Sequence, residues 1–258
     1  MSKVLVDLNS DLGESFGRYQ IGWDARVMDF VSSANIACGF HAGDPATMQR
    51  TVRLAGGKKV AVGAHPGFPD LQGFGRRNLD CSPDEAYDMA LYQIGALDAF
   101  VRSNGLRLQH VKPHGALYNR AVQDAPLSDA LVGATRDYRD DLIFVGLPFS
   151  EMEKAAGSAG VRFAAEVFAD RTYQADGSLT SRRQANAFVK DPDQAAARVV
   201  AMILDRRVQA VTGEWIAIRP DTVCLHGDNP DAIAFIEKIH HALRESDIEV
   251  SPLHRWLA

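Results

Sequence analysis

The sequence predicts an α/β protein that folds as a single β/α barrel of about seven parallel strands. Short apolar runs with a β-branched bias alternate with helical patterns along the 258 residues, and such alternation favours parallel strands joined by right-handed crossovers. No linker-like composition divides the chain, so residues 1–258 are expected to form one domain. A doubly wound open sheet is the alternative, but no GxGxxG motif follows the first strand to support it.

The expected strands are short apolar segments bounded by turn residues. They cover residues 4–8, 33–38, 59–64, 108–112, 142–147, 161–167 and 222–225. A small hairpin is expected within residues 208–218, broken at Thr212-Gly213-Glu214.

Capping residues and helical spacing predict the helices between these strands. Asp44 precedes Pro45, and Ser82-Pro83-Asp84-Glu85 forms a capping box with proline at the first helical position. The other expected helices cover residues 24–31, 127–135, 150–156 and 195–204, and a last helix carries Ile233, Ile236, Ile239 and Leu243 on one face.

Composition narrows the class of protein. A formal net charge of -5 without a basic stripe argues against nucleic-acid binding. The N-terminus lacks the apolar core of a signal peptide, and no run approaches the roughly 18 apolar residues of a membrane span. Cys38, Cys81 and Cys224 are widely spaced and odd in number, which is typical of reduced thiols in a cytoplasmic protein.

Polar residues follow the expected strands at their carboxyl ends. In a parallel barrel these ends meet at one mouth, where the loops carry the chemistry. A single histidine there is usually structural, but four with acidic neighbours indicate a site. The set comprises Asp7, Asp11, Glu14, His41, Asp44, His65, Lys112, His114, Glu166, Asp170, Arg171, His226 and Asp228.

These side chains suit proton transfer on a small acidic substrate. Imidazoles exchange protons near neutral pH and carboxylates orient them or act as bases, so the catalytic candidates are Asp11, His41, His65 and His114. Cations such as Lys112 and Arg171 can hold an anion. The candidates for substrate binding are Asp7, Glu14, Lys112, Glu166, Arg171 and His226.

A divalent metal is one interpretation of the same set, because two histidines and a carboxylate from separate strands are a common site. The expected ligands would be Asp11, His41 and His65. A metal-free acid/base pocket is the equal alternative. HExxH, paired CxxC, GxSxG and P-loop motifs are absent, and Gly73-Phe74-Gly75-Arg76-Arg77 is either an anion-binding loop or a solvated basic turn.

Several of these motifs together resemble the LamB/YcsF family, the family of the 5-oxoprolinase A subunits. The match runs in order from residue 4 to about residue 230. It rests on residues 7–14, 34–44, 63–67, 73–76, 111–119, 166–171 with Tyr173, and 226–228.

The resemblance implies a barrel similar to the glycoside hydrolase/deacetylase group and a hydrolase that opens 5-oxo-L-proline to L-glutamate with ATP as co-substrate. It also implies a complex with 5-oxoprolinase subunits B and C, and the missing P-loop is consistent with phosphoryl transfer by those partners. Two other functions stay open: a stand-alone metal-dependent deacetylase or amidohydrolase, and a non-catalytic subunit that binds the substrate.

We expect ATP to activate the lactam carbonyl and a mouth residue, Asp11, His41 or His65, to deprotonate the attacking water. Lys112 or Arg171 would hold the substrate carboxylate, and His114 would protonate the leaving nitrogen.

Overall fold

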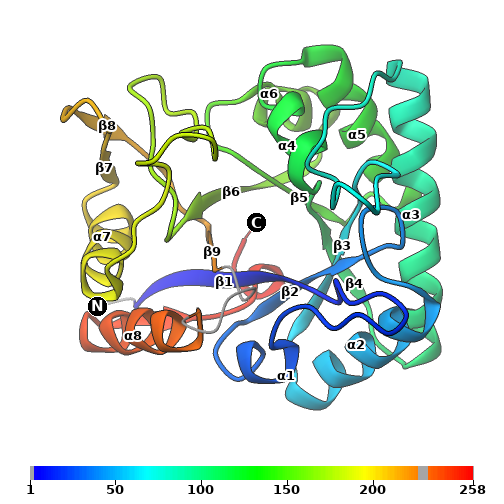
Figure 1. Cartoon of the computed structure of the whole chain (residues 1–258), viewed down its shortest axis with the longest axis horizontal. Helices are drawn as coiled ribbons and strands as arrows, with labels where there is room; N and C mark the ends of the chain where they lie inside the picture. The colour runs from blue at the N-terminus through cyan, green and yellow to red at the C-terminus, as the bar shows by residue number, and fades with distance from the viewer. Residues whose placement is uncertain (1–2, 226–231, 258) are drawn as a thin grey trace.

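Seven parallel strands close into a barrel in the computed structural model, which describes residues 3–225 and 232–257 (Figure 1). In chain order the ring consists of β1 (Val4–Leu12), β2 (Ser33–Ala37), β3 (Ala61–His65), β4 (Leu108–Val111), β5 (Ile143–Gly146), β6 (Arg162–Phe168) and β9 (Thr222–Cys224). Each strand pairs with the next, and β9 pairs with β1 to complete the circle. The predicted barrel is therefore confirmed, and the open sheet is excluded.

Helices surround the ring (Figure 1). They are α1 (Asp24–Val27), α2 (Pro45–Lys58), α3 (Pro83–Ser103), α4 (Gly115–Ala121), α5 (Ala125–Tyr138), α6 (Glu151–Ala159), α7 (Pro192–Leu204) and α8 (Ala232–Glu245). The predicted caps form: Asp44 accepts a hydrogen bond from the Thr47 amide, and Ser82 and Glu85 make the reciprocal capping box. Within the described residues, no helix is both long and apolar enough to cross a membrane.

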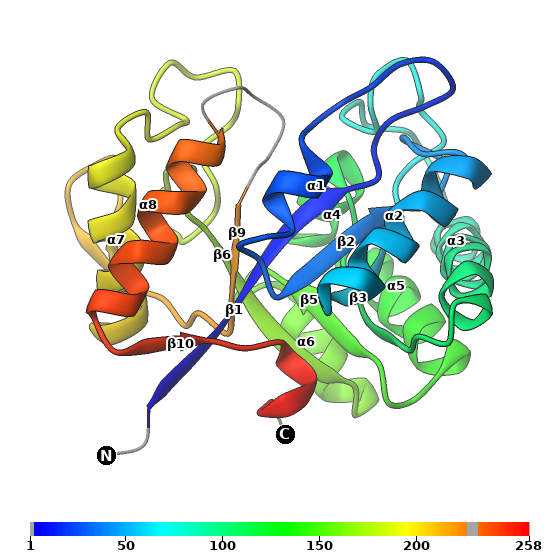
Figure 2. The same cartoon turned by 90° about the horizontal axis from the view of Figure 1, so that it is seen from below.

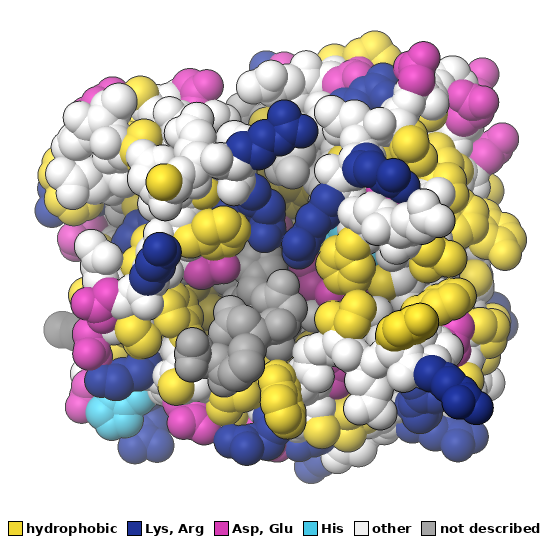
Figure 3. Space-filling view, viewed as in Figure 1, with side chains coloured by type: hydrophobic (Ala, Val, Ile, Leu, Met, Phe, Trp, Pro, Cys, Tyr) yellow, Lys and Arg dark blue, Asp and Glu magenta, His cyan; other side chains and the backbone are white. Residues whose placement is uncertain are grey.

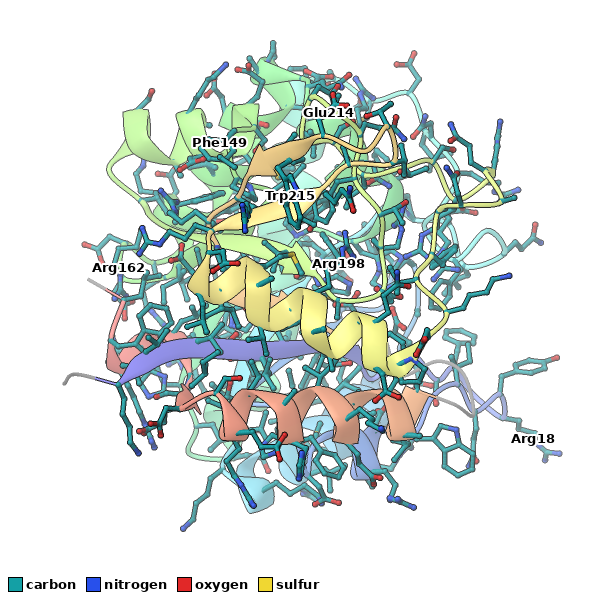
Figure 4. All side chains as sticks on the ribbon, turned by 90° about the vertical axis from the view of Figure 1, so that its left-hand side faces the viewer. Arg18, Phe149, Arg162, Arg198, Glu214 and Trp215 are labelled. Atoms are coloured by element: carbon teal, nitrogen blue, oxygen red, sulfur yellow. The ribbon has the colours of Figure 1, made fainter. Side chains whose placement is uncertain are left out.

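The expected hairpin is present as β7 (Arg207–Gln209) and β8 (Trp215–Ala217), which pair antiparallel. Figure 4 shows this hairpin beside α7, with Trp215 on β8 and Arg198 on α7. Arg198 donates a hydrogen bond to the backbone oxygen of Arg171 (2.6 Å), and its guanidinium lies 5.3 Å from the centre of the Tyr173 ring. This side of the barrel is therefore tied to the loop that follows β6.

Some element predictions differ from the structure. β1 extends to Leu12 rather than ending at residue 8, because its polar residues bond inside the ring instead of forming a loop. α1 ends at Val27, earlier than expected. The helix α4, the strand β10 (Ile248–Val250) and the short helix η1 (Leu253–Arg255) were not predicted, since none is long enough to carry a clear period.

The two ends of the barrel differ. The loops after the strands gather at one end, while β10, η1 and the chain's end lie at the other (Figure 2). β10 pairs with the first residues of β1. Leu253 packs against Ile143, Val145 and Ala164, so it closes the floor of the barrel opposite the mouth.

Candidate active site

A buried cluster of one carboxylate and three imidazoles lies at the mouth of the barrel. One ligand atom each from Glu14, His41, His65 and His114 lies within 4.8 Å of all the others. His65 Nε2 is 2.9 Å from His114 Nδ1, and Glu14 Oε1 is 3.3 Å from His41 Nε2 and 3.6 Å from His114 Nδ1. The rings of His41 and His114 are stacked with centroids 3.7 Å apart.

Backbone carbonyls fix the tautomers of two of these histidines. His65 Nδ1 lies 2.7 Å from the Lys112 carbonyl oxygen and His114 Nε2 lies 2.8 Å from that of Phe74. A carbonyl only accepts, so these nitrogens carry the protons and the lone pairs of His65 Nε2 and His114 Nδ1 face each other. Two facing lone pairs repel unless a cation lies with them. The donor set therefore fits a divalent metal ion or a shared proton.

Two glycines let the mouth loops pack against the imidazoles. A Cβ at Gly67 would lie 2.6 Å from His41 Nδ1, and one at Gly75 would lie 2.6 Å from His41 Cβ and 2.8 Å from His114 Cδ2. Gly75 also has φ +62°, which side chains other than glycine rarely adopt. The glycines near the histidines thus admit the imidazole rings.

Burial sets the protonation of the cluster. It lowers the pKa of His41 and of His114 well below the usual range, and the neighbouring imidazoles lower both further. Burial raises the pKa of Glu14; the nearby His114 lowers this pKa and the nearby Asp11 raises it further. Burial therefore favours the neutral form of His41 and His114 near pH 7, and neutral imidazole is the form that binds metals.

Lys112 is buried beside the cluster. Its Nζ lies 2.9 Å from Asp11 Oδ1 and 2.7 Å from Glu166 Oε1, and it also donates to Asn9 and Cys224. Burial alone lowers the pKa of Lys112, but Asp11, Cys224 and Glu166 together raise it well above the usual value. The Lys112 ammonium is therefore already paired with internal carboxylates. The other oxygen of Asp11, Oδ2, lies 3.3 Å from His65 Nε2.

The cluster opens into a cavity of about 440 Å³ with a basic wall. The wall includes Arg76, Arg171, Arg182 and Arg183, and Figure 3 shows Lys and Arg side chains around the hollow in the mouth face. Arg171 is buried, and burial together with Arg182 lowers its pKa to about 10. Its Nε has no hydrogen-bond partner among the described residues, so Arg171 retains a donor for an anion.

The structure gathers most of the predicted site residues. Those that line the cavity or join the cluster are Asp11, Glu14, His41, His65, Lys112, His114 and Arg171, with Glu166 bound to Lys112. The acid/histidine cluster contains His41 and His65 of the predicted metal set and adds Glu14 and His114, while Asp11 lies alongside it.

Asp7 and His226 are not among the residues that line the described cavity. Asp7 is buried below the cavity, where it accepts hydrogen bonds from Ser32, Ser33 and Thr222, and it does not line the cavity. His226, together with Asp228, lies outside the described residues.

Sequence reasoning missed Asn9, Asn35 and His110, which are buried in the ring and bond to one another or to Asp11. The signal was available, because polar residues recur at every second position of residues 7–11 and again at 110 and 112.

Comparisons with known proteins agree on one family. The model of the LamB/YcsF family matches residues 6–258. The chain is 54% identical over 248 residues to the 5-oxoprolinase A subunit of Tolumonas auensis, covering 96% of this chain and 99% of that protein. It is 52% identical over 248 residues to that of Bacillus subtilis, with 96% of both chains covered.

A crystal structure of the lactam utilization protein from Thermus thermophilus superposes with a TM-score of 0.92. That protein is 45% identical to this chain, and the match covers 96% of this chain and 99% of that one.

Proposed function

Because this chain belongs to the LamB/YcsF family, we propose that it is the subunit of a 5-oxoprolinase that opens the lactam of 5-oxo-L-proline to L-glutamate, in a reaction coupled to ATP hydrolysis. Two observations together support the proposal. The chain aligns with 5-oxoprolinase A subunits over nearly its full length at 54% and 52% identity, and a buried acid/histidine cluster lies at the barrel mouth.

The cavity has room for the substrate, and its charge is complementary to that of the substrate. 5-Oxo-L-proline is a small monoanion, and a cavity of about 440 Å³ with arginines on one wall accommodates it. Arg171 is the better candidate to hold its carboxylate, because Lys112 already contacts Asp11 and Glu166. We assign carboxylate binding to Arg171.

A divalent cation fits the four donors Glu14, His41, His65 and His114. The N–H groups that His65 and His114 donate to backbone carbonyls are the outer contacts that orient metal-bound imidazoles. When bound, such an ion would supply a Lewis acid for the lactam carbonyl.

Asp11 is the candidate base in this arrangement. Lys112 and Asn35 both donate to its Oδ1, which favours the ionised form, and it lines the cavity. It would take a proton from the attacking water, as a general base does. Without a metal, His65 and His114 would share a proton over their 2.9 Å contact and could deliver it to the leaving nitrogen.

ATP coupling is assigned to the complex. The sequence has no P-loop, and the relatives are named as one lettered subunit of 5-oxoprolinase, which implies further subunits. We propose that partners B and C supply phosphoryl transfer that activates the lactam carbonyl, and that the present chain receives the activated ring.

Glutamate release from 5-oxoproline plus ATP tests the proposal, measured with the chain alone, with subunits B and C alone, and with all three. Activity only with all three supports it. ATP-independent hydrolysis by the metal-loaded chain alone would instead identify a stand-alone amidohydrolase. A raised KM with unchanged kcat in the complex carrying folded Asp11→Asn, His41→Ala or His114→Ala variants would identify a non-catalytic binding subunit, and full activity of all three would contradict the proposed roles.

A further inference from the structure

A line of polar side chains crosses four neighbouring strands at one level of the ring. The strand registers align Asp11 of β1 with Asn35 of β2, Asn35 with Gly63 of β3, and Gly63 with His110 of β4. His110 Nε2 lies 2.6 Å from Asn35 Oδ1, and Asn35 Nδ2 lies 2.8 Å from Asp11 Oδ1. The line therefore ends on the candidate base.

Gly63 is the residue that lets this line cross β3. A Cβ built there would lie 2.0 Å from His110 Nε2 and 2.2 Å from its Cδ2. Both atoms belong to the ring of a fully buried histidine. The imidazole thus occupies the space of the missing side chain and reaches Asn35 two strands away.

The same line continues to the floor of the barrel. Gln109 Nε2 lies 3.0 Å from His110 Nδ1 and 3.1 Å from Ser33 Oγ. Gln109 Oε1 accepts hydrogen bonds from the backbone amide of His254 at 3.2 Å and from its Nδ1 at 2.6 Å. The segment that closes the floor is therefore joined to the line that reaches the mouth.

One backbone group fixes the direction of every bond in the line. The His254 amide only donates, so the atom of Gln109 that faces it is the oxygen and the atom that faces His110 is the NH₂ group. His110 Nδ1 must then accept and its Nε2 must carry the proton. Asn35 consequently accepts through Oδ1 and presents its NH₂ group to Asp11.

A second group requires the same direction independently. The Lys112 ammonium only donates, and it lies 3.2 Å from Asn9 Oδ1. Asn35 Nδ2 lies 2.7 Å from that same oxygen, so the side chain of Asn35 must face Asn9 and Asp11 with its NH₂ group. Burial also lowers the pKa of His110 to about 3, which keeps the ring neutral with one proton to place.

We infer that Gln109, His110 and Asn35 are positioning residues that hold the Asp11 carboxylate in one orientation. Asn35 and Lys112 bind Oδ1, which leaves Oδ2 on the side of His65. With the direction reversed, Asn35 would present its carbonyl oxygen to Asp11, and the two would repel. The line thus sets which oxygen of the candidate base faces the cluster.

The tautomer of His110 tests the inference directly and does not depend on the proposed function. In the full-length chain labelled with ¹⁵N-histidine, long-range proton–nitrogen spectra assigned with a His110→Gln variant should show His110 protonated at Nε2. Gln109→Glu removes the donor to Nδ1 and should move the proton to Nδ1. A wild-type His110 protonated at Nδ1 would overturn the inference.

Kinetics in the reconstituted complex test the consequence, and this arm rests on the proposed function. His110→Leu and Gln109→Glu should lower kcat by about 10-fold to 100-fold with KM changed less than about 2-fold, because a displaced base slows the chemical step. His110→Gln keeps an N–H directed at Asn35 and should stay within about 3-fold of wild type.

Tyr138→Phe is the matched control, since it removes a partly buried hydrogen bond to Asp98 that is no part of this line. It should lower thermal stability without lowering kcat. Unchanged kcat in folded His110→Leu, or equal losses in His110→Leu and His110→Gln, would contradict positioning. If the wild-type complex releases no glutamate, the proposed function fails, and the tautomer measurement still decides the inference.

Discussion

The two faces of β1 differ in character. Its outer face packs into the apolar layer between the strands and the helices through Val6, Leu8 and Leu12. Its inner face forms hydrogen bonds across the inside of the ring through Asp7, Asn9 and Asp11. Barrels of this class ordinarily fill the inside with layers of bulky branched residues. Here the outer face provides that apolar packing, and much of the inner face carries hydrogen-bonded polar groups. The outer face therefore stabilises the closed ring, and the inner face determines the chemistry of the site.

Removing an imidazole at the top of the inner face should have the largest effect. His65→Ala deletes the nitrogen that faces His114 and Asp11, so glutamate release by the complex should fall about 10³-fold, within the range for a lost proton-transfer group. His241→Ala on the exposed side of α8 is the control and should leave the rate unchanged. More than a tenth of wild-type activity in folded His65→Ala would break the contrast.

The next largest effect should come from breaking the buried ion pairs of the inner face, and it should appear in the free energy of unfolding. Lys112→Met leaves Asp11 and Glu166 without their common cation, and loss of one partner of a buried ion pair costs about 3–5 kcal/mol. Urea unfolding measures the change. Adding Glu166→Gln removes one of the uncompensated charges, so the double variant should recover part of the loss; a purely additive result would show that the two side chains are not coupled.

A substitution on the outer face should separate stability from activity. Leu8→Ala removes a fully buried side chain from the apolar layer and should lower the free energy of unfolding by about 3 kcal/mol. Its neighbours on the inner face stay in place, so kcat per folded molecule should be retained below the unfolding transition. A loss of kcat similar to that of His65→Ala would mean that the two faces are not independent.

The free energy of unfolding should depend on pH through Asp7, which is buried on the inner face. Burial raises the pKa of Asp7 to about 6 from its usual 3.8, against hydrogen bonds from Ser33, Thr222 and Ser32. Between these values the folded chain keeps the proton that the unfolded chain releases, so this contribution to stability is present below pH 3.8 and is lost as the pH rises through 6.

The loss amounts to up to about 3 kcal/mol over the whole window, at 1.36 kcal/mol per unit of pKa. Asp7→Asn should lack this contribution, so the difference between the unfolding free energies of the two proteins should change with pH across the window. Parallel profiles for the two proteins would show that Asp7 titrates alike in both states.

The fold was predictable because it depends on the outer face. Alternating strands and helices, with caps at Asp44 and Ser82, are local signals, and the closed ring follows from parallel connections. The histidines and acids at the strand ends were predictable for a similar reason, since all those ends meet at one mouth.

The inner face was not predictable in the same way. The sequence pattern predicts an exit loop at Asn9, whereas this residue bonds to Thr222, which is 213 residues away. Alternation of polar residues places His110 on the inner face, but its contact with Asn35 depends on the absence of a side chain at Gly63, which the pattern does not indicate. The sequence likewise does not indicate that three hydroxyl groups surround the Asp7 carboxylate. Such contacts are set by strand register, which no local pattern specifies.

The bond from the His254 amide to Gln109 has a consequence for the order in which the molecule is completed. A growing chain that has reached Cys224 contains all seven strands of the ring. It still lacks the His254 amide, which donates to Gln109 Oε1 and so fixes the orientation of the Gln109 side chain. In such a chain the Lys112 ammonium already orients Asn9 and Asn35, whereas the group that orients Gln109 belongs to a segment synthesised after every strand of the ring.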